Sequence, residues 1–172
     1  MKRTASISDV IQPLDSTPFQ CYMSNAIQVA DVLEYALAYT GPADVTMTSF
    51  SISEEFLRRL FFIRKKGNVK SLRIVLDYKA TNKTLLLWPF ISRTVEHCYL
   101  ADNHSKILLI RGATNQVAVI TSQNLTRGNR YECASIVTDG ACYANIAAQL
   151  EEVIKSQSVP FHDIYRQRIA AD

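Results

Sequence analysis

The sequence contains little glycine and proline, and it has no long uninterrupted run of apolar residues. Glycine and proline each occur 5 times in 172 residues, and such low counts predict a chain dense in helices and strands. The longest apolar run, residues 85–91, is far shorter than the roughly 20 residues that cross a bilayer. No apolar stretch follows the basic residues 1–3, so we expect no signal peptide, no membrane contact and a cytoplasmic location.

The sequence contains four cysteines, and their spacing excludes the common uses of cysteine in small proteins. No two cysteines stand in a C-x-x-C pattern, and no histidine lies at zinc-ligand distance from a cysteine pair. We therefore expect no structural zinc and no disulfide framework. We expect instead four free thiols, buried or half-buried, in a reducing compartment: Cys21, Cys98, Cys133 and Cys142.

The composition is that of an ordinary globular protein. The apolar fraction is 48% and the charged fraction 20%, which excludes a disordered tail, a coiled coil and a collagen-like repeat. The length predicts one domain over residues 1–172. Residues 1–20 contain Pro13 and Pro18 and are predicted to form an irregular N-terminal arm.

The net charge of +3 is small, but the cations are concentrated in one segment. Residues 58–73, the basic window, contain seven lysines and arginines and no acidic residue, so the rest of the chain is acidic on balance. Such a segment is a candidate binding surface for a polyanion. An equally open alternative is a solvated helix end, where the helix dipole also favours cations.

The spacing of apolar residues predicts an α/β fold, in which helices cover both faces of a mixed sheet. Helices are predicted over residues 24–39, 51–64, 81–92, 143–156 and 161–171. Strands are predicted over residues 43–50, 71–78, 95–100, 106–110, 116–121 and 132–137.

Chemically useful side chains gather between residues 103 and 132. His104 and Lys106 stand two apart at the start of a predicted strand, so they share a face. Ser122 and Asn124 follow the next strand at the same spacing, and Glu132 opens the one after it. Imidazole, ammonium, amide and carboxylate groups at one end of a sheet suit chemistry on a phosphoryl group. Taken singly, each residue is more simply a surface or turn residue.

The order His-x-Lys, Ser-x-Asn, Glu resembles the phospholipase D superfamily, whose signature is HxK(x)4D, then GSxN, then a glutamate. The resemblance is close over residues 103–132, and the predicted elements are compatible with that family's α-β-α sandwich elsewhere. Two positions depart from it: Arg111 stands where the family has aspartate, and Thr121 where it has glycine. The signature occurs once, as in the small bacterial endonucleases that pair two chains to build one site.

The resemblance implies a role for each residue of the motif. His104 would attack phosphorus, and His104 of a second protomer would protonate the leaving oxygen. Lys106 and Asn124 would bind the phosphoryl oxygens, with Ser122 as a weaker donor, and Glu132 would hold the imidazole. No metal and no cofactor is implied.

The basic window favours a nucleic-acid substrate, in the first place DNA, contacted mainly through its phosphates. The cations expected to contact it are Arg64, Lys65, Lys66, Arg127 and Arg130. The first hypothesis is thus a homodimeric, metal-independent phosphodiesterase. A second is a degenerate module that binds DNA or another phosphorylated partner without cleaving it, which Arg111 favours. A third is a toxin or phospholipase component of a larger assembly. We expect Arg111 itself to lie outside the site, exposed to solvent or paired with an acidic neighbour.

Overall fold

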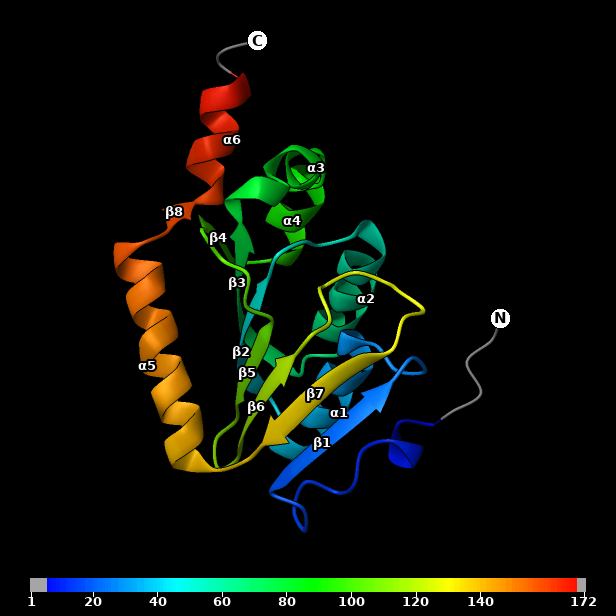
Figure 1. The fold of residues 1–172 in the computed structure, drawn as a ribbon. Coiled ribbons are helices and arrows are strands. Elements are labelled where there is room, and N and C mark those ends of the chain that lie inside the picture. Colours follow the sequence, from blue (N-terminus) through cyan, green and yellow to red (C-terminus); the bar gives the residue numbers. More distant parts are fainter. Residues whose placement is uncertain (1–5, 170–172) are drawn as a thin grey trace.

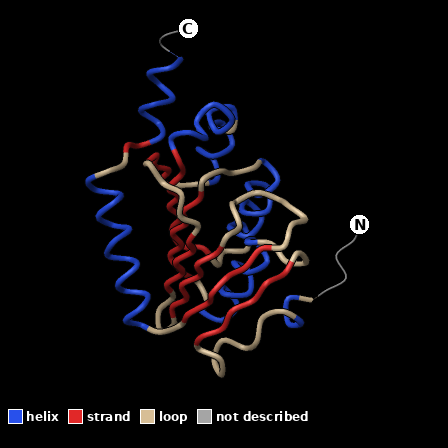
Figure 2. Tube along the Cα trace, in the orientation of Figure 1, coloured by secondary structure: helices blue, strands red, loops and turns tan. Residues whose placement is uncertain are grey.

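The computed structural model describes residues 6–169, apart from the side chains of residues 80–83 and 169. The strands are Phe19–Ser24 (β1), Ala43–Ser49 (β2), Val69–Asp77 (β3), His97–Ala101 (β4), Ile107–Arg111 (β5), Gln116–Thr121 (β6), Glu132–Val137 (β7) and Val159–Pro160 (β8). They form an eight-stranded sheet in the order β1-β7-β6-β5-β2-β3-β4-β8 (Figures 1 and 2). The pairs β2–β3 and β3–β4 are parallel, and the other pairs are antiparallel.

Helices cover both faces of the sheet. The α-helices are Val29–Thr40 (α1), Glu54–Lys65 (α2), Thr81–Leu86 (α3), Trp88–Thr94 (α4), Gly140–Ser156 (α5) and Phe161–Ile169 (α6), with short 3-10 turns at Ile7–Asp9 and Tyr78–Ala80. Helices α1 and α2 pack on one face and close the larger core, while α5 covers part of the other (Figure 1). The mixed α/β architecture expected from the sequence is confirmed.

Helix α2 shows how the sequence pattern produces a packed element. Its buried residues recur at helical spacing and face the sheet: Phe56, Leu57, Leu60 and Ile63. The sequence places a capping box at Ser51 and Glu54, but the helix begins two residues later. Ser53 is the N-cap, and its hydroxyl accepts a hydrogen bond from the Phe56 backbone N–H at 3.2 Å.

The first strand is the main difference from the sequence-based expectation. Residues 1–20 are predicted as an irregular arm, whereas β1 begins at Phe19 and pairs with β7 along its whole length. The register places Phe19 opposite Val137 and Ser24 opposite Glu132. Phe19 and Met23 point away from the core and are 63% and 72% exposed, so the strand carries little of the apolar signal that marks the buried strands.

The cysteines are free, as expected, but they are not all shielded. Cys98 is buried and Cys142 half-buried, while Cys21 and Cys133 are exposed on β1 and β7. The expectation of four shielded thiols is therefore wrong for these two, because no helix covers their part of the sheet face. Within residues 6–169, the structure contains no helix of the length and apolarity that crossing a membrane requires.

Gly112 follows β5 at a point where the chain passes close to the end of α1. A Cβ atom built here would lie 2.2 Å from the carbonyl oxygen of Thr40. Gly112→Ala is therefore expected to lower the free energy of unfolding by about 2 kcal/mol, since the backbone must shift to relieve the overlap. Gly128→Ala is the matched control, because a Cβ there meets nothing within 4 Å. Urea unfolding of both variants measures the difference, and equal midpoints would contradict the expectation.

Candidate active site

The residues of the motif come together at one edge of the sheet. Strands β2, β3 and β6 end at this edge, while the antiparallel strands β5 and β7 begin there. The register confirms the arrangement, because Ile107 of β5 pairs with both Thr48 of β2 and Ile120 of β6. The segments that carry the five motif residues are therefore neighbours at this edge of the sheet, although they are separated along the sequence.

His104 and Lys106 lie on the segment that leads into β5. The Lys106 Nζ is 3.5 Å from the His104 Nδ1 and donates a 2.7 Å hydrogen bond to the His104 carbonyl oxygen. The imidazole is exposed, and its ring centre lies 5.4 Å from that of Phe50. The predicted shared direction of the two side chains is thus present, with the ammonium beside the imidazole.

The charge of Lys106 is balanced by its surroundings. Partial burial lowers the pKa of its ammonium, because desolvation penalises the charged form. The carboxylates of Glu132 and Asp77 act in the opposite direction and favour the charged form. The site therefore contains a cation that is partly withdrawn from water, an arrangement that strengthens its attraction to an anionic group.

Ser49, the last residue of β2, connects the other segments of the site. Its hydroxyl donates to the Ser51 carbonyl oxygen at 2.7 Å, accepts from the Leu125 backbone N–H at 3.0 Å and lies 3.2 Å from the Asn124 Oδ1. Its carbonyl oxygen accepts from the Asn103 Nδ2 at 3.2 Å. Because the Asn124 Oδ1 lies against Ser49, the amide NH₂ is the group left to donate to a ligand.

Asp77 fixes the loop that carries His104. It is 2% exposed, and its carboxylate accepts hydrogen bonds from the backbone N–H groups of Asn103, at 3.0 Å, and Lys79, at 2.6 Å. Ser49, Asp77 and Asn103 are not among the residues predicted for the site. A polar residue at the end of a buried apolar strand is the signal that marks Ser49 and Asp77.

Glu132 is placed at the site but is not bonded to the imidazole of its own chain. Its carboxylate accepts a short hydrogen bond from the Ser122 hydroxyl, and the Cys133 backbone N–H donates to the same hydroxyl at 3.1 Å. Arg130, whose side chain is 79% exposed, lies 3.8 Å from the Glu132 Oε1. Among residues 6–169, no carboxylate forms a hydrogen bond with His104. Support of the imidazole by Glu132 stays a prediction.

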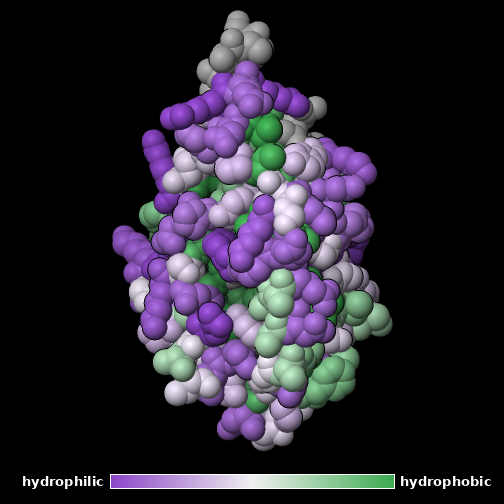
Figure 3. Space-filling model, turned by 90° about the vertical axis from the view of Figure 1, so that its left-hand side faces the viewer, coloured by the Kyte–Doolittle hydropathy of each residue, from purple (hydrophilic) through white to green (hydrophobic). Residues whose placement is uncertain are grey.

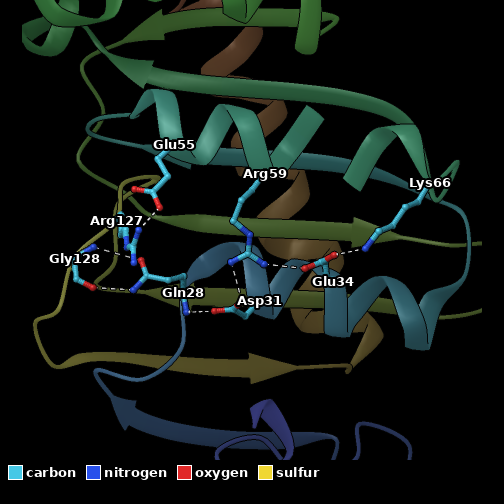
Figure 4. A network of polar contacts seen from close by, with 8 residues as sticks. All are labelled: Gln28, Asp31, Glu34, Glu55, Arg59, Lys66, Arg127 and Gly128. Carbon is cyan, nitrogen blue, oxygen red and sulfur yellow. Dashed lines mark hydrogen bonds and ion pairs between the residues drawn. The ribbon is translucent and has the colours of Figure 1, made fainter. Parts of the chain in front are cut away.

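The basic window is largely neutralised by ion pairs within the chain. Arg59 pairs with Asp31 and Glu34 of α1, and Lys66 pairs with Glu34 at 2.6 Å (Figure 4). The other paired cations are Arg58 with Glu54, Arg64 with Glu96 and Arg73 with Glu151. The pairs of Arg59, Arg64 and Lys66 join α2 and its C-cap to α1 and to the residue before β4, so the window has a structural role that the sequence does not disclose.

The structure does not bring the cations of the window to the candidate site. Arg64, Lys65 and Lys66 lie at the end of α2, next to the start of β3 and therefore at the opposite edge of the sheet. Arg127 and Arg130 are in the loop between β6 and β7, which borders the site. Arg127 pairs with Glu55 in the first turn of α2 at 2.5 Å (Figure 4).

Arg111 is the last residue of β5, so it lies at the edge opposite His104. It is exposed and lines a hollow between α5 and the sheet. Arg111→Ala is therefore expected to leave duplex affinity and nicking rate unchanged within about twofold, since sites this far apart act independently. Paired measurements of duplex affinity and nicking rate on the wild type and on Arg111→Ala test this expectation. A large rise in nicking for Arg111→Asp would instead show that the wild-type chain is an enzyme disabled by Arg111.

Known structures share this architecture. A phospholipase D family member, Nuc from Salmonella typhimurium, superposes with a TM-score of 0.61 at 14% identity, covering 83% of this chain and 97% of Nuc. The chain has a phospholipase D-like fold. NucT from Helicobacter pylori matches with a TM-score of 0.58 at 14% identity, covering 81% of this chain and 98% of NucT.

Another solved structure with this architecture is that of a DNA-binding protein. The archaeal chromatin protein TrmBL2 has a TM-score of 0.55 at 10% identity, and the match covers 85% of this chain and 55% of TrmBL2. No protein-family model matches the sequence, and no curated protein matches it either. At these identities the likeness establishes the fold, and function must be argued from the site.

Proposed function

We propose that the chain is a phospholipase D-type phosphodiesterase, in the simplest case a nuclease that cleaves nucleic-acid phosphodiester bonds. One observation carries the proposal. A nucleophile, a cation, an amide donor and a carboxylate meet at one edge of a sheet whose fold Nuc also has: His104, Lys106, Asn124 and Glu132. Lys106 and Asn124 supply donors for the non-bridging oxygens, so the proposed reaction uses no metal.

The proposed reaction has two displacements. An imidazole nitrogen of His104 attacks phosphorus, the bond to the leaving oxygen breaks, and the partner's His104 gives that oxygen a proton. The partner's histidine then removes a proton from water. The resulting hydroxide attacks the phosphohistidine, and the phosphorus–nitrogen bond breaks to release His104. The phosphate product leaves as a monoester, and both histidines return to their starting protonation states.

Two protomers are required because the chain supplies one set of these groups. The other histidines, His97 and His162, are followed two residues later by Tyr99 and Ile164 rather than lysine. An isologous dimer with a two-fold axis near His104 would provide the second imidazole. Sedimentation at micromolar concentration should show a dimer, and a strict monomer that cleaves DNA would contradict the shared site.

A second function, binding of a phosphate group without cleavage, is favoured by two observations, one on His104 and one on Arg111. Among residues 6–169 no carboxylate orients His104, and Arg111 replaces the family's aspartate. A site with donors but without an activated nucleophile would hold a phosphate group without cleaving it. This is the binding-module hypothesis, and the DNA-binding protein TrmBL2 has the same fold.

Nicking of supercoiled plasmid in EDTA separates the two functions. A phosphodiesterase of the proposed type converts the plasmid to the relaxed form in chelator. Salt-sensitive plasmid binding with no relaxed product selects the binding module instead, since counterion release governs such binding.

A further inference from the structure

A hollow beneath α5 contains polar groups that the proposed catalysis does not use. It has a volume of about 180 Å³ and lies between α5 and the sheet, at the edge opposite His104. Its polar lining consists of Asp44, Thr46, Arg73, Arg111, Tyr143 and Glu151. Figure 3 shows the side of the molecule on which α5 lies, where hydrophilic residues form most of the surface.

Tyr143 brings a hydroxyl to this hollow. The residue is 7% exposed, and its ring packs in the small core that also contains Leu109 and Leu150. Among the residues that the structure describes, none forms a hydrogen bond with the phenol oxygen, and this oxygen is open to the solvent of the hollow rather than buried. The hydroxyl is therefore a donor available to a ligand in the hollow.

Arg111 is a second available donor at the same place. It stands directly opposite Asp44 in the β2–β5 register, yet no acidic side chain of the described chain lies within ion-pair distance of it. The Asp44 carboxylate instead accepts a 2.5 Å hydrogen bond from the Ser71 hydroxyl.

The other arginine of the hollow is already engaged. Arg73 pairs with Glu151 and donates to the Thr46 hydroxyl at 3.1 Å and 3.2 Å. Its charge is thus balanced within the protein. Arg111 and Tyr143 are left as the two donors without partners, and both line the same space.

We propose that this hollow is a binding site for a small organic carboxylate, held by the Arg111 guanidinium and the Tyr143 hydroxyl. A guanidinium presents parallel N–H donors that match the two oxygens of a carboxylate, and a phenol adds a third hydrogen bond. The volume limits the ligand to a small molecule.

The surrounding charges favour a carboxylate over a phosphate dianion. Asp44 and Glu151 both act on Tyr143 as anions, while Arg111 and Arg73 act on it as cations. The two arginines and the two carboxylates of the hollow balance one another, and the carboxylates would repel a doubly charged group more strongly than a singly charged one.

The test uses propionate, acetate and inorganic phosphate, each titrated into the full chain while the backbone amide signals of Leu109 and Ala147, which line the hollow, are followed by NMR. Saturable shifts with a carboxylate are expected. Arg111→Gln and Tyr143→Phe should each weaken binding at least tenfold. Asp44→Asn should strengthen it, because the change removes a repelling charge beside Arg111. Arg93→Gln, on α4, is the matched control and should bind as the wild type does.

Three outcomes would overturn the proposal. One is that neither carboxylate produces a saturable shift, and another is that both donor variants bind as the wild type does. The third is that phosphate binds more tightly than propionate, which would reject the assigned ligand class. Because Tyr143→Phe keeps the ring in the core, a folding defect in Arg111→Gln would not remove the test.

Discussion

His104→Ala should lower the rate of plasmid nicking by about 10⁴-fold or more, because one substitution removes both the nucleophile and, in the partner, the acid. In the proposed dimer each site contains two copies of His104. The remaining Lys106 and Asn124 can still bind phosphate, so duplex affinity should fall far less than the rate. The measurement is nicking in EDTA under single-turnover conditions, together with duplex binding by the same protein.

The control for this variant is His97→Ala. His97 is an exposed histidine at the start of β4, and its ring stacks on Tyr99 at 6.4 Å. Its loss should leave nicking unchanged within about twofold, as for most surface substitutions away from a site. If both alanine variants cleave like the wild type, His104 is not the nucleophile and the proposed chemistry is wrong.

Lys106→Ala should slow nicking by about 10²–10³-fold, the usual cost of removing one preorganised donor from a charged transition state. Asn124 cannot replace the lost positive charge. Lys65→Ala is the comparison, because Lys65 is an exposed lysine at the opposite edge of the sheet. Lys65→Ala should change only the salt dependence of DNA affinity. The slope of log affinity against log salt concentration should change by at most about one unit. Small and equal effects of the two variants would reject the assignment of Lys106.

The pH profile gives an independent test of Lys106. Its pKa is lowered by burial, so on raising the pH it loses its proton earlier than an exposed lysine does. The rate should therefore fall on the alkaline side, beginning below the ordinary lysine pKa. Lys106→Arg keeps its charge throughout this range, so whatever its rate, its profile should lack that alkaline decline. A decline that persists in Lys106→Arg would belong to another group.

The candidate site was largely predictable because its groups follow a local rule. His104 and Lys106 lie directly before β5, and Ser122 and Asn124 directly after β6, so the predicted strand boundaries already place both pairs at one edge of the sheet. The fold class was predictable for a similar reason, since buried helices and strands carry strong periodic signals. Strand β7 begins and ends at the predicted residues, Glu132 and Val137.

What the sequence could not disclose depends on contacts between distant segments. The basic window looks like a surface for a polyanion, yet Arg59 and Arg64 find their acidic partners on other elements, in Glu34 and Glu96. Strand β1 has weak apolar character and exists because β7 pairs with it. The hydrogen bonds of Ser49 and Asp77 join residues that are 75 and 26 positions apart, and no local pattern contains such information.

The pairing of β1 with β7 also has a consequence for how the molecule assembles. Phe19 and Val137 are direct neighbours in the sheet, so the first strand can find its place only after β7 has been synthesised. Contacts of such long sequence separation form late, because closing the intervening loop costs entropy before any contact compensates it. We therefore expect that, during synthesis on the ribosome, the outer strand β1 pairs with β7 only after the central strands β2 and β3 have formed. Until then β7 has a free edge, which makes it the segment most open to pairing with another chain.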